Sequence, residues 1–273
     1  MFRRDTFADL ANQINPLRLH LNLLRASCVR PFLFAAIIGA VFTTTVFAKG
    51  EAALHYLKAG RPNAAELLAP PPLPDSAEQA ADMAAVVSVS MASSSNDMAL
   101  ALSEKKFSVF NFTPAAGDFF KTDKLPRSVA FFQRVQEDAT AATDAAKEYW
   151  KRPRPYTLNP SLASGKLEKS FSYPSGHATE SMVLALVLAE ACPDRREAIM
   201  AIGCSLGWHR VWIGRHYPTD IYAGRVFAKA IIREMKANHN FLDDLAEARA
   251  EITAAAARTL PLTHAPVPVP ATH

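Results

Sequence analysis

Apolar residues recur at helical spacing through most of this chain, and no stretch shows convincing strand alternation. One amphipathic face follows steps of three and four residues, through Val129, Phe132, Val135, Ala139, Ala142, Ala146 and Tyr149. A second run, 178–191, reads ATESMVLALVLAEA and consists mainly of strong helix formers. The pattern therefore predicts an all-α fold, a single compact domain packed from six or more helices.

Proline and serine residues mark the ends of the expected helices. An Ala- and Leu-rich stretch over 49–68 has a helical pattern and stops at the proline run 70–74. Asp75 or Ser76 can cap the next helix, which we expect to reach about residue 102 with a break at a serine triplet. Ser128 can cap the one after it. The remaining helices are expected over 178–191, 195–207, 218–236 and 242–256.

The first 48 residues have the pattern of an export signal. A basic region up to Arg30 precedes the apolar run PFLFAAIIGAVF, and small residues before and at Ala48 suit cleavage after that position. The run is short for a membrane span, which needs about 20 apolar residues. The long basic region also leaves an uncleaved anchor open. We expect a periplasmic or secreted protein with no stable membrane span after cleavage.

Composition divides the chain into four parts and limits its partners. We expect a signal peptide over 1–48, an N-terminal helix and Pro-rich connector over 49–75, a helical domain over 76–258 and a disordered Pro-rich tail over 259–273. The net charge is +4, but five arginines against two aspartates place most of it in the first 48 residues. The rest is nearly neutral, so nothing indicates a nucleic-acid partner.

Two cysteines remain after the expected cleavage. Cys192 and Cys204 lie near the ends of two successive expected helices. An oxidising compartment permits a disulfide between them. Two thiols buried on apolar helix faces explain the pattern equally well, because free cysteine is often buried.

Three clusters carry candidate chemistry. Lys147 is followed seven residues later by Arg154, and both are cations. The turn of Ser175, Gly176 and His177 directly precedes the apolar run, which places it at a helix N-terminus where unpaired N–H groups favour an anion. The third cluster comes about forty residues later and consists of Arg210, His216 and Asp220.

This set of groups suits a phosphate. Two guanidinium groups and one ammonium can surround a tetrahedral oxyanion, and the N–H groups of the turn complete the cradle. His216 can then attack phosphorus while Asp220 holds its other ring nitrogen. His177 can protonate the leaving oxygen.

Each cluster alone also has an ordinary structural explanation. Lys147 could be a solvated helix residue, and Arg154 and Arg210 could pair with surface acids. His216 and Asp220 could form a local hydrogen-bonded pair in a loop. The occurrence of all the groups together, in this order, argues against these explanations.

The three clusters resemble the three-part signature of the type 2 phosphatidic acid phosphatase superfamily, over about residues 67–236. The segment Leu67-Leu68-Ala69-Pro70-Pro71-Pro72 with Asp75-Ser76 is similar to the N-terminal part of bacterial class A non-specific acid phosphatases. The resemblance implies the helical fold of acid phosphatases and vanadium haloperoxidases. It also implies hydrolysis of small phosphate monoesters through a phosphohistidine, without a metal or other cofactor.

The resemblance assigns roles by position. His216 would be the nucleophile, Asp220 its orienting acid and His177 the proton donor. The implied phosphate ligands are Lys147, Arg154, Ser175, Gly176 and Arg210. One position departs from the family, because His209 stands where a serine is usual. His209 could alter the pH dependence or specificity, or it could be a neutral replacement packed beside Trp208.

Three other functions remain open at this point. A vanadium-dependent haloperoxidase would use the same cradle for vanadate, although the short chain argues against it. A membrane lipid phosphatase would need several long apolar spans, and the best internal run, 182–189, is far shorter. A non-enzymatic phosphate-binding protein would not need His177 beside the nucleophile. The family also permits a homo-oligomer, but the sequence does not locate its interface.

Overall fold

The computed structural model describes residues 54–259, which belong to one compact unit. The predicted signal and all but the first residue of the predicted tail lie outside the described part. Within residues 54–259 every regular element is a helix, which confirms the all-α prediction. Four helices form the main stack, and they are α5 (Pro126–Trp150), α7 (Gly176–Ala191), α8 (Arg196–Trp212) and α9 (Pro218–Lys236).

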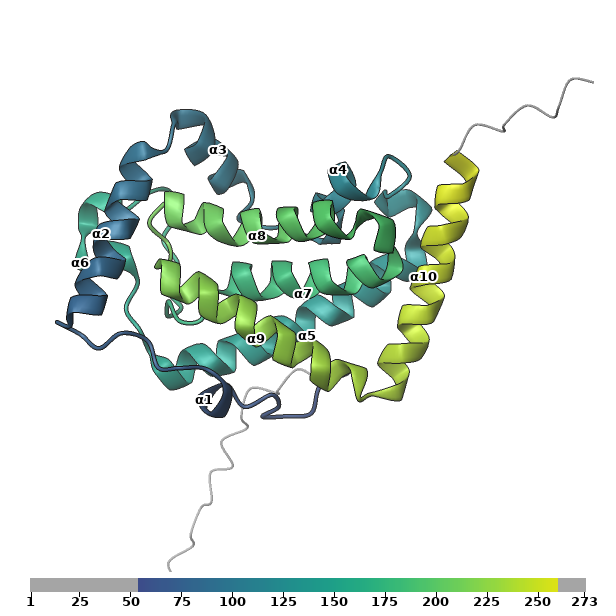
Figure 1. Ribbon diagram of the computed structural model, residues 1–273, viewed down its shortest axis with the longest axis horizontal. Coiled ribbons are helices and arrows are strands. Elements are labelled where there is room, and N and C mark those ends of the chain that lie inside the picture. Colours follow the sequence, from purple (N-terminus) through teal and green to yellow (C-terminus); the bar gives the residue numbers. More distant parts are fainter. Residues whose placement is uncertain (1–53, 260–273) are drawn as a thin grey trace, which may run out of the picture. The chain divides into compact units, whose positions relative to one another are not determined.

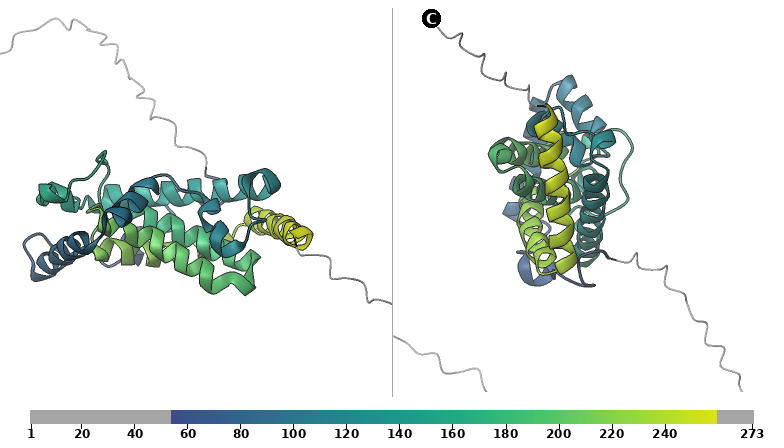
Figure 2. Two further views of the ribbon diagram at one scale, coloured as in Figure 1. Left: turned by 90° about the horizontal axis from the view of Figure 1, so that it is seen from above. Right: turned by 90° about the vertical axis from the view of Figure 1, so that its right-hand side faces the viewer.

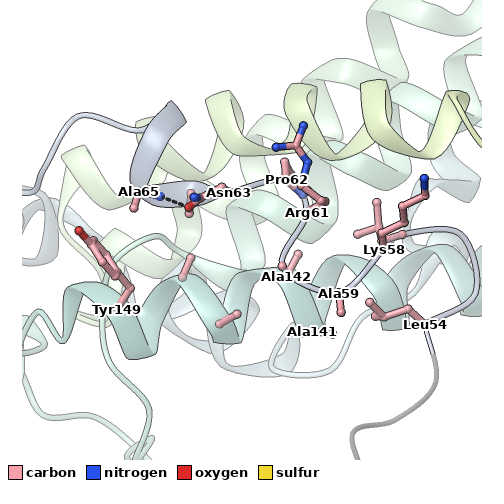
Figure 3. A pocket seen from close by; sticks show the side chains of 15 residues that line it. Leu54, Lys58, Ala59, Arg61, Pro62, Asn63, Ala65, Ala141, Ala142 and Tyr149 are labelled. Atoms are coloured by element: carbon pink, nitrogen blue, oxygen red, sulfur yellow. Dashed lines mark hydrogen bonds between the residues drawn. The ribbon is translucent and has the colours of Figure 1, made fainter.

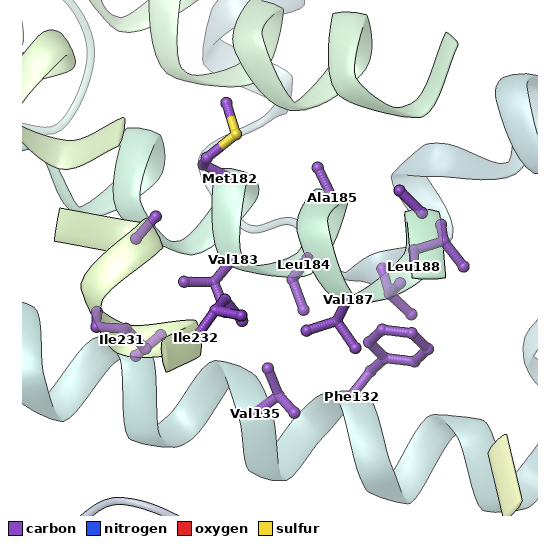
Figure 4. Packing of buried hydrophobic residues seen from close by; sticks show 14 of the residues in the cluster. Phe132, Val135, Met182, Val183, Leu184, Ala185, Val187, Leu188, Ile231 and Ile232 are labelled. Atoms are coloured by element: carbon purple, nitrogen blue, oxygen red, sulfur yellow. The ribbon is translucent and has the colours of Figure 1, made fainter. Parts of the chain in front are cut away.

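Helix α7 lies at the centre of this stack, in contact with α5, α8, α9 and α10 (His239–Thr259) (Figure 1). None of its residues is exposed on any side, as expected for a helix enclosed by others. Val183, Leu184 and Val187 pack against Phe132 and Val135 of α5 (Figure 4). The same cluster includes Ile231 and Ile232 of α9.

Shorter helices cover the two ends of the stack. α2 (Ala77–Ala92), α3 (Ser95–Ser103) and α6 (Pro155–Leu158) lie at the end opposite α10, as Figure 1 and the left view of Figure 2 both show. The remaining short helices are α1 (Ala64–Leu67), η1 (Val109–Phe112), α4 (Thr113–Ala116), η2 (Thr122–Lys124), η3 (Pro160–Leu162) and η4 (Pro193–Arg195).

Several predicted helix boundaries agree with the structure. Ser76 caps α2 through a bond from Gln79 N, the serine triplet separates α2 from α3, and α9 spans the predicted 218–236. Helix α8 runs to Trp212, five residues beyond the predicted end, and α10 is longer at both ends. Tyr149, predicted on the buried face of α5, is exposed.

The prediction that Ser128 caps a helix is wrong. Helix α5 begins two residues earlier, at Pro126, without a side-chain cap. Ser128 instead donates its hydroxyl and its N–H to the Glu251 carboxylate of α10, at 2.7 Å each. The local sequence predicted that Ser128 would bond to its own helix. Its partner is instead Glu251, 123 residues further along the chain.

The described part of the predicted 49–68 helix is also mostly not helical. Only Ala64–Leu67 forms α1, capped by Asn63. Upstream, the Asp138 carboxylate accepts the backbone N–H groups of His55, Tyr56 and Leu57. These donors would otherwise form helical bonds, so a contact with α5 overrides the local helix propensity.

Glycine permits a close contact between α7 and α8 next to the site. A Cβ built at Gly207 would lie 2.9 Å from both Cα and Cβ of Ala178, the residue that follows His177.

We expect Gly207→Ala to destabilise the protein by about 1–2 kcal/mol, since overpacking outweighs the gain in helix propensity. Chemical denaturation measures this change. Ser205→Ala, an exposed change on the same helix, should stay within about 0.5 kcal/mol of the parent. A Gly207→Ala protein as stable as the parent would contradict the close packing.

Candidate active site

The sequence-predicted site residues come together at one end of the helix stack, on the left in Figure 1. Lys147 is on the last turn of α5, Arg154 precedes α6, and Ser175 to His177 begin α7. Helix α8 ends near Arg210, and Asp220 is in the first turn of α9. The antiparallel order of the stack therefore brings two helix C-termini and two N-termini to the same place.

His216 lies in the tight connection between α8 and α9 and is buried. Gly214 makes this turn with φ of +62°, and a Cβ there would lie 2.7 Å from the Cβ of Leu162. The His216 Nε2 lies 3.2 Å from the Arg154 guanidinium, while its Nδ1 lies 3.4 Å from Oδ2 of Asp220. Burial, followed by the charge of Arg154, holds the pKa of His216 well below its usual value. The ring is therefore neutral, and Nδ1–H facing Asp220 leaves a lone pair on Nε2.

Asp220 is fully buried and bound from several directions. Its carboxylate accepts the Ser172 hydroxyl at 2.6 Å, the Tyr217 N–H at 2.9 Å and the Arg152 guanidinium at 2.6 Å. Burial raises the pKa of the Asp220 carboxyl, and the contacts with Arg152 and Ser172 oppose that rise. Its backbone oxygen accepts the Ser175 N–H, which ties the phosphate turn to α9.

Arg152 is a buried residue that the sequence interpretation missed. Besides Asp220, it donates to the Asp82 carboxylate of α2 at 2.7 Å and to Thr219 at 2.7 Å. Its guanidinium carbon lies 3.9 Å from the centre of the Tyr217 ring. The alternating Arg-Pro-Arg-Pro of residues 152–155 was the available signal, and it places two arginines rather than one at the site.

The two arginines predicted to bind phosphate face each other across a carboxylate. Arg154 donates to the Ser170 backbone oxygen at 2.7 Å and pairs with Glu168 at 2.6 Å. Arg210 donates to the Ala101 backbone oxygen at 2.6 Å, and its other nitrogen lies 3.7 Å from Glu168. Burial lowers the pKa of Arg210 to about 10, which still leaves it charged. Glu168 was not among the predicted residues.

The turn before α7 has the predicted helix-terminal geometry. The Ser175 hydroxyl accepts the Ala178 N–H at 3.3 Å and keeps its own proton available as a donor. A Cβ at Gly176 would lie 3.2 Å from the Lys147 ammonium and 3.3 Å from Glu180. Glycine thus leaves room for the ammonium beside the helix N-terminus. Burial raises the pKa of the Glu180 carboxyl to about 7, against the effects of Gln136 and Lys147.

His177, the second residue of α7, packs against the Phe107 ring at 5.2 Å. Its Nε2 lies 3.1 Å from the Glu104 backbone oxygen and must donate to it, because a carbonyl only accepts. Burial, followed by the charge of Arg210, lowers the pKa of His177 to about 3. The resting ring is neutral with its proton on Nε2.

His209 contacts a different tryptophan from the one predicted. Its ring stacks on Trp212 at 4.0 Å, so the suggested packing beside Trp208 is wrong. Its Nδ1 lies 2.8 Å from the Glu104 carboxylate, and Glu104 also holds His177. His209 therefore reaches the candidate proton donor through a single residue.

Other features give no competing site. A groove of about 690 Å³ lies between the 54–65 segment and α5, and no candidate site residue lines it (Figure 3). In the part of the chain that the structure describes, His, Cys, Asp and Glu residues form no cluster of three that could hold a metal. Cys192 and Cys204 are free and half-buried. None of the helices between residues 54 and 259 has the length and apolar character needed to cross a bilayer.

Comparison with known proteins identifies the family of this chain. The PAP2 superfamily profile matches residues 138–242, which include all the predicted site residues. The chain is 30% identical to an acid phosphatase of Zymomonas mobilis over 194 residues, covering 68% of this chain and 74% of that protein. The chain therefore belongs to the PAP2 superfamily.

Further relatives show how far the similarity extends. A non-specific acid phosphatase of Salmonella typhi is 33% identical over 147 residues, covering 52% of this chain and 59% of that protein. The chain spans about half the length of the non-specific acid phosphatases that it matches. A transmembrane PAP2 type phosphatidylglycerolphosphate phosphatase from Bacillus subtilis superposes with a TM-score of 0.44 at 20% identity, covering 64% of this chain and 89% of that one.

Proposed function

We propose that this protein is an exported acid phosphatase that hydrolyses small phosphate monoesters through a phosphohistidine on His216. The observation that carries the proposal is the environment of this imidazole. It is buried and neutral, Asp220 faces one nitrogen, and the other points to Arg154. Acid phosphatases among the relatives support the substrate class. The three-part pattern of the first 48 residues supports export to the periplasm or secretion.

In the first step, Nε2 of His216 attacks phosphorus, a P–N bond forms and the ester P–O bond breaks. The charges of Lys147, Arg154 and Arg210 stabilise the negative charge on the phosphoryl oxygens. The leaving oxygen takes a proton from His177. Water then attacks phosphorus, the P–N bond breaks, and His177 takes the proton of the water as inorganic phosphate forms.

The low pKa of His177 fits this sequence once substrate binds. The charges of Arg210 and Lys147 contribute to that low value after burial. A phosphate dianion between them offsets their charge and raises the pKa of the ring, which then gains its second proton on Nδ1. Acidic conditions favour this state, so we expect an acid optimum.

Hydrolysis of p-nitrophenyl phosphate by purified protein tests the proposal. We expect turnover at pH 4 to 6 that is unchanged by EDTA, since the proposed step uses only side chains of this chain. A vanadate-loaded sample tested for halide oxidation and a detergent-solubilised lipid phosphate provide the two comparison reactions. Halide oxidation without phosphatase activity, or turnover of the lipid alone, would contradict the proposal.

A further inference from the structure

Glu168 places an anion between the two arginines proposed to bind phosphate. Its Oε2 lies 2.6 Å from the Arg154 guanidinium, and its Oε1 lies 3.7 Å from that of Arg210. It is half-buried, whereas its neighbours over 165–167 and 169–170 are exposed. The side chains of Glu168 and Ser170 both contact Arg154, and Glu168 is the one that brings a negative charge.

The backbone of the loop is held independently of this side chain. The Tyr156 hydroxyl donates to the Glu168 backbone oxygen at 2.7 Å. Arg215 donates to the backbone oxygens of Ser164 and Lys166, and the Ser164 hydroxyl donates to Ile213 O at 3.2 Å. A change of rotamer at Glu168 can therefore remove its carboxylate from the arginines while the loop stays in place.

The contacts of Arg154 show which of its hydrogen-bond donors the Glu168 carboxylate occupies. Nε and NH2 of Arg154 are bound to Ser170, while NH1 donates to the Arg215 backbone oxygen at 3.0 Å and also faces His216 and Glu168. A phosphoryl group poised for attack by His216 needs this same NH1. Burial raises the pKa of the Glu168 carboxyl, but the surrounding positive charges, Arg154 first among them, oppose that rise, and the net pKa lies below the usual value. The lowered pKa favours the charged carboxylate beside the two arginines.

We propose that Glu168 determines the affinity of the site for oxyanions, as an internal competitor that phosphate displaces from Arg154 and Arg210. This inference rests on the proposed function of the site. Carboxylate and phosphate use the same donors, so every ligand that enters must first replace these contacts. Return of the carboxylate assists release of the product phosphate. The displacement weakens substrate and product binding by the same factor.

The Glu168→Gln variant removes the charge and keeps the shape. We expect the Kd of inorganic phosphate, measured by calorimetry, to fall by about tenfold or more, because one tenfold step needs only 1.4 kcal/mol of lost competition. The KM for p-nitrophenyl phosphate should fall by a similar factor, with kcat within about threefold of the parent. Glu168→Asp, with a carboxylate one methylene shorter, should give an intermediate tightening.

Glu148→Gln is the matched control, because it removes the same charge from an exposed position of α5 near the site. Its phosphate Kd should stay within about twofold of the parent. Unchanged or weaker phosphate binding in Glu168→Gln, in an enzyme that turns over normally, would overturn this inference alone. Tighter phosphate binding in a protein without turnover would support the inference and contradict the proposed function.

Discussion

The His216→Ala variant is expected to lose phosphatase activity by at least about 10⁴-fold in kcat/KM. Alanine removes the His216 Nε2 that lies 3.2 Å from Arg154 NH1, and with it the P–N bond of the proposed first step. The cradle cations remain, so inorganic phosphate should still bind with a Kd within about tenfold of the parent. Steady-state turnover of p-nitrophenyl phosphate together with calorimetry separates the two effects.

Trapping of the covalent intermediate tests directly whether His216 carries the phosphoryl group. Labelled substrate quenched at early times should leave about one acid-labile phosphoryl group on the parent protein and none on His216→Ala. His239→Ala changes an exposed histidine at the start of α10 and should leave both readouts unchanged. Label on the His216→Ala protein would assign the nucleophile elsewhere.

The Arg152→Gln variant is expected to lower kcat by about 10²- to 10³-fold with little change in KM. Arg152 does not reach the cradle, but it pairs with the Asp220 carboxylate that faces Nδ1 of His216. Without the guanidinium, Asp220 is a buried carboxylate with one fewer cation, and its pKa rises further. Because a protonated Asp220 no longer accepts the His216 proton, the acidic limb of the kcat profile should move to higher pH.

The pH profile distinguishes this positioning role from a general loss of stability. Arg127→Gln removes an exposed arginine whose side chain pairs with Glu247, far from the site, and it should change neither the profile nor kcat. Asp82→Asn alters the other side of Arg152 without touching Asp220, so it should give a smaller loss in the same direction. A folded Arg152→Gln protein with the parent's kcat and profile would exclude this role.

Helix starts were predictable where the residue at the start caps the helix with its own side chain or, as proline, needs no hydrogen bond for its nitrogen. Ser76 and Ser175 accept bonds from the helices they precede, and Pro218 starts α9 without needing the N–H it lacks. The start of α5 near Ser128 and the non-helical segment before Asn63 were not predictable. There the partners are Glu251 and Asp138, carboxylates from distant parts of the chain, and no local pattern reveals them.

The site residues were predictable where they lie a few residues apart in the sequence or directly before an apolar helix. His216 and Asp220 are four residues apart, and the helix N-terminus after Ser175 follows from the apolar run. Arg152 was missed because its role depends on Asp82, seventy residues earlier on α2. Glu168 was missed because a loop of alternating charges does not show which side chain turns inward. The roles of Arg152 and Glu168 are both set by contacts between distant parts of the chain.

The burial of α7 restricts where this protein can vary. No residue of Gly176–Ala191 is exposed, and Ala178 touches α8 through Gly207. A substitution along this helix would therefore affect folding and the phosphate turn together. The loop over 163–171 and helices α2 and α3 border the site without forming the central stack. Divergence of substrate preference among descendants of this chain should accumulate in those segments, while α7 stays nearly invariant.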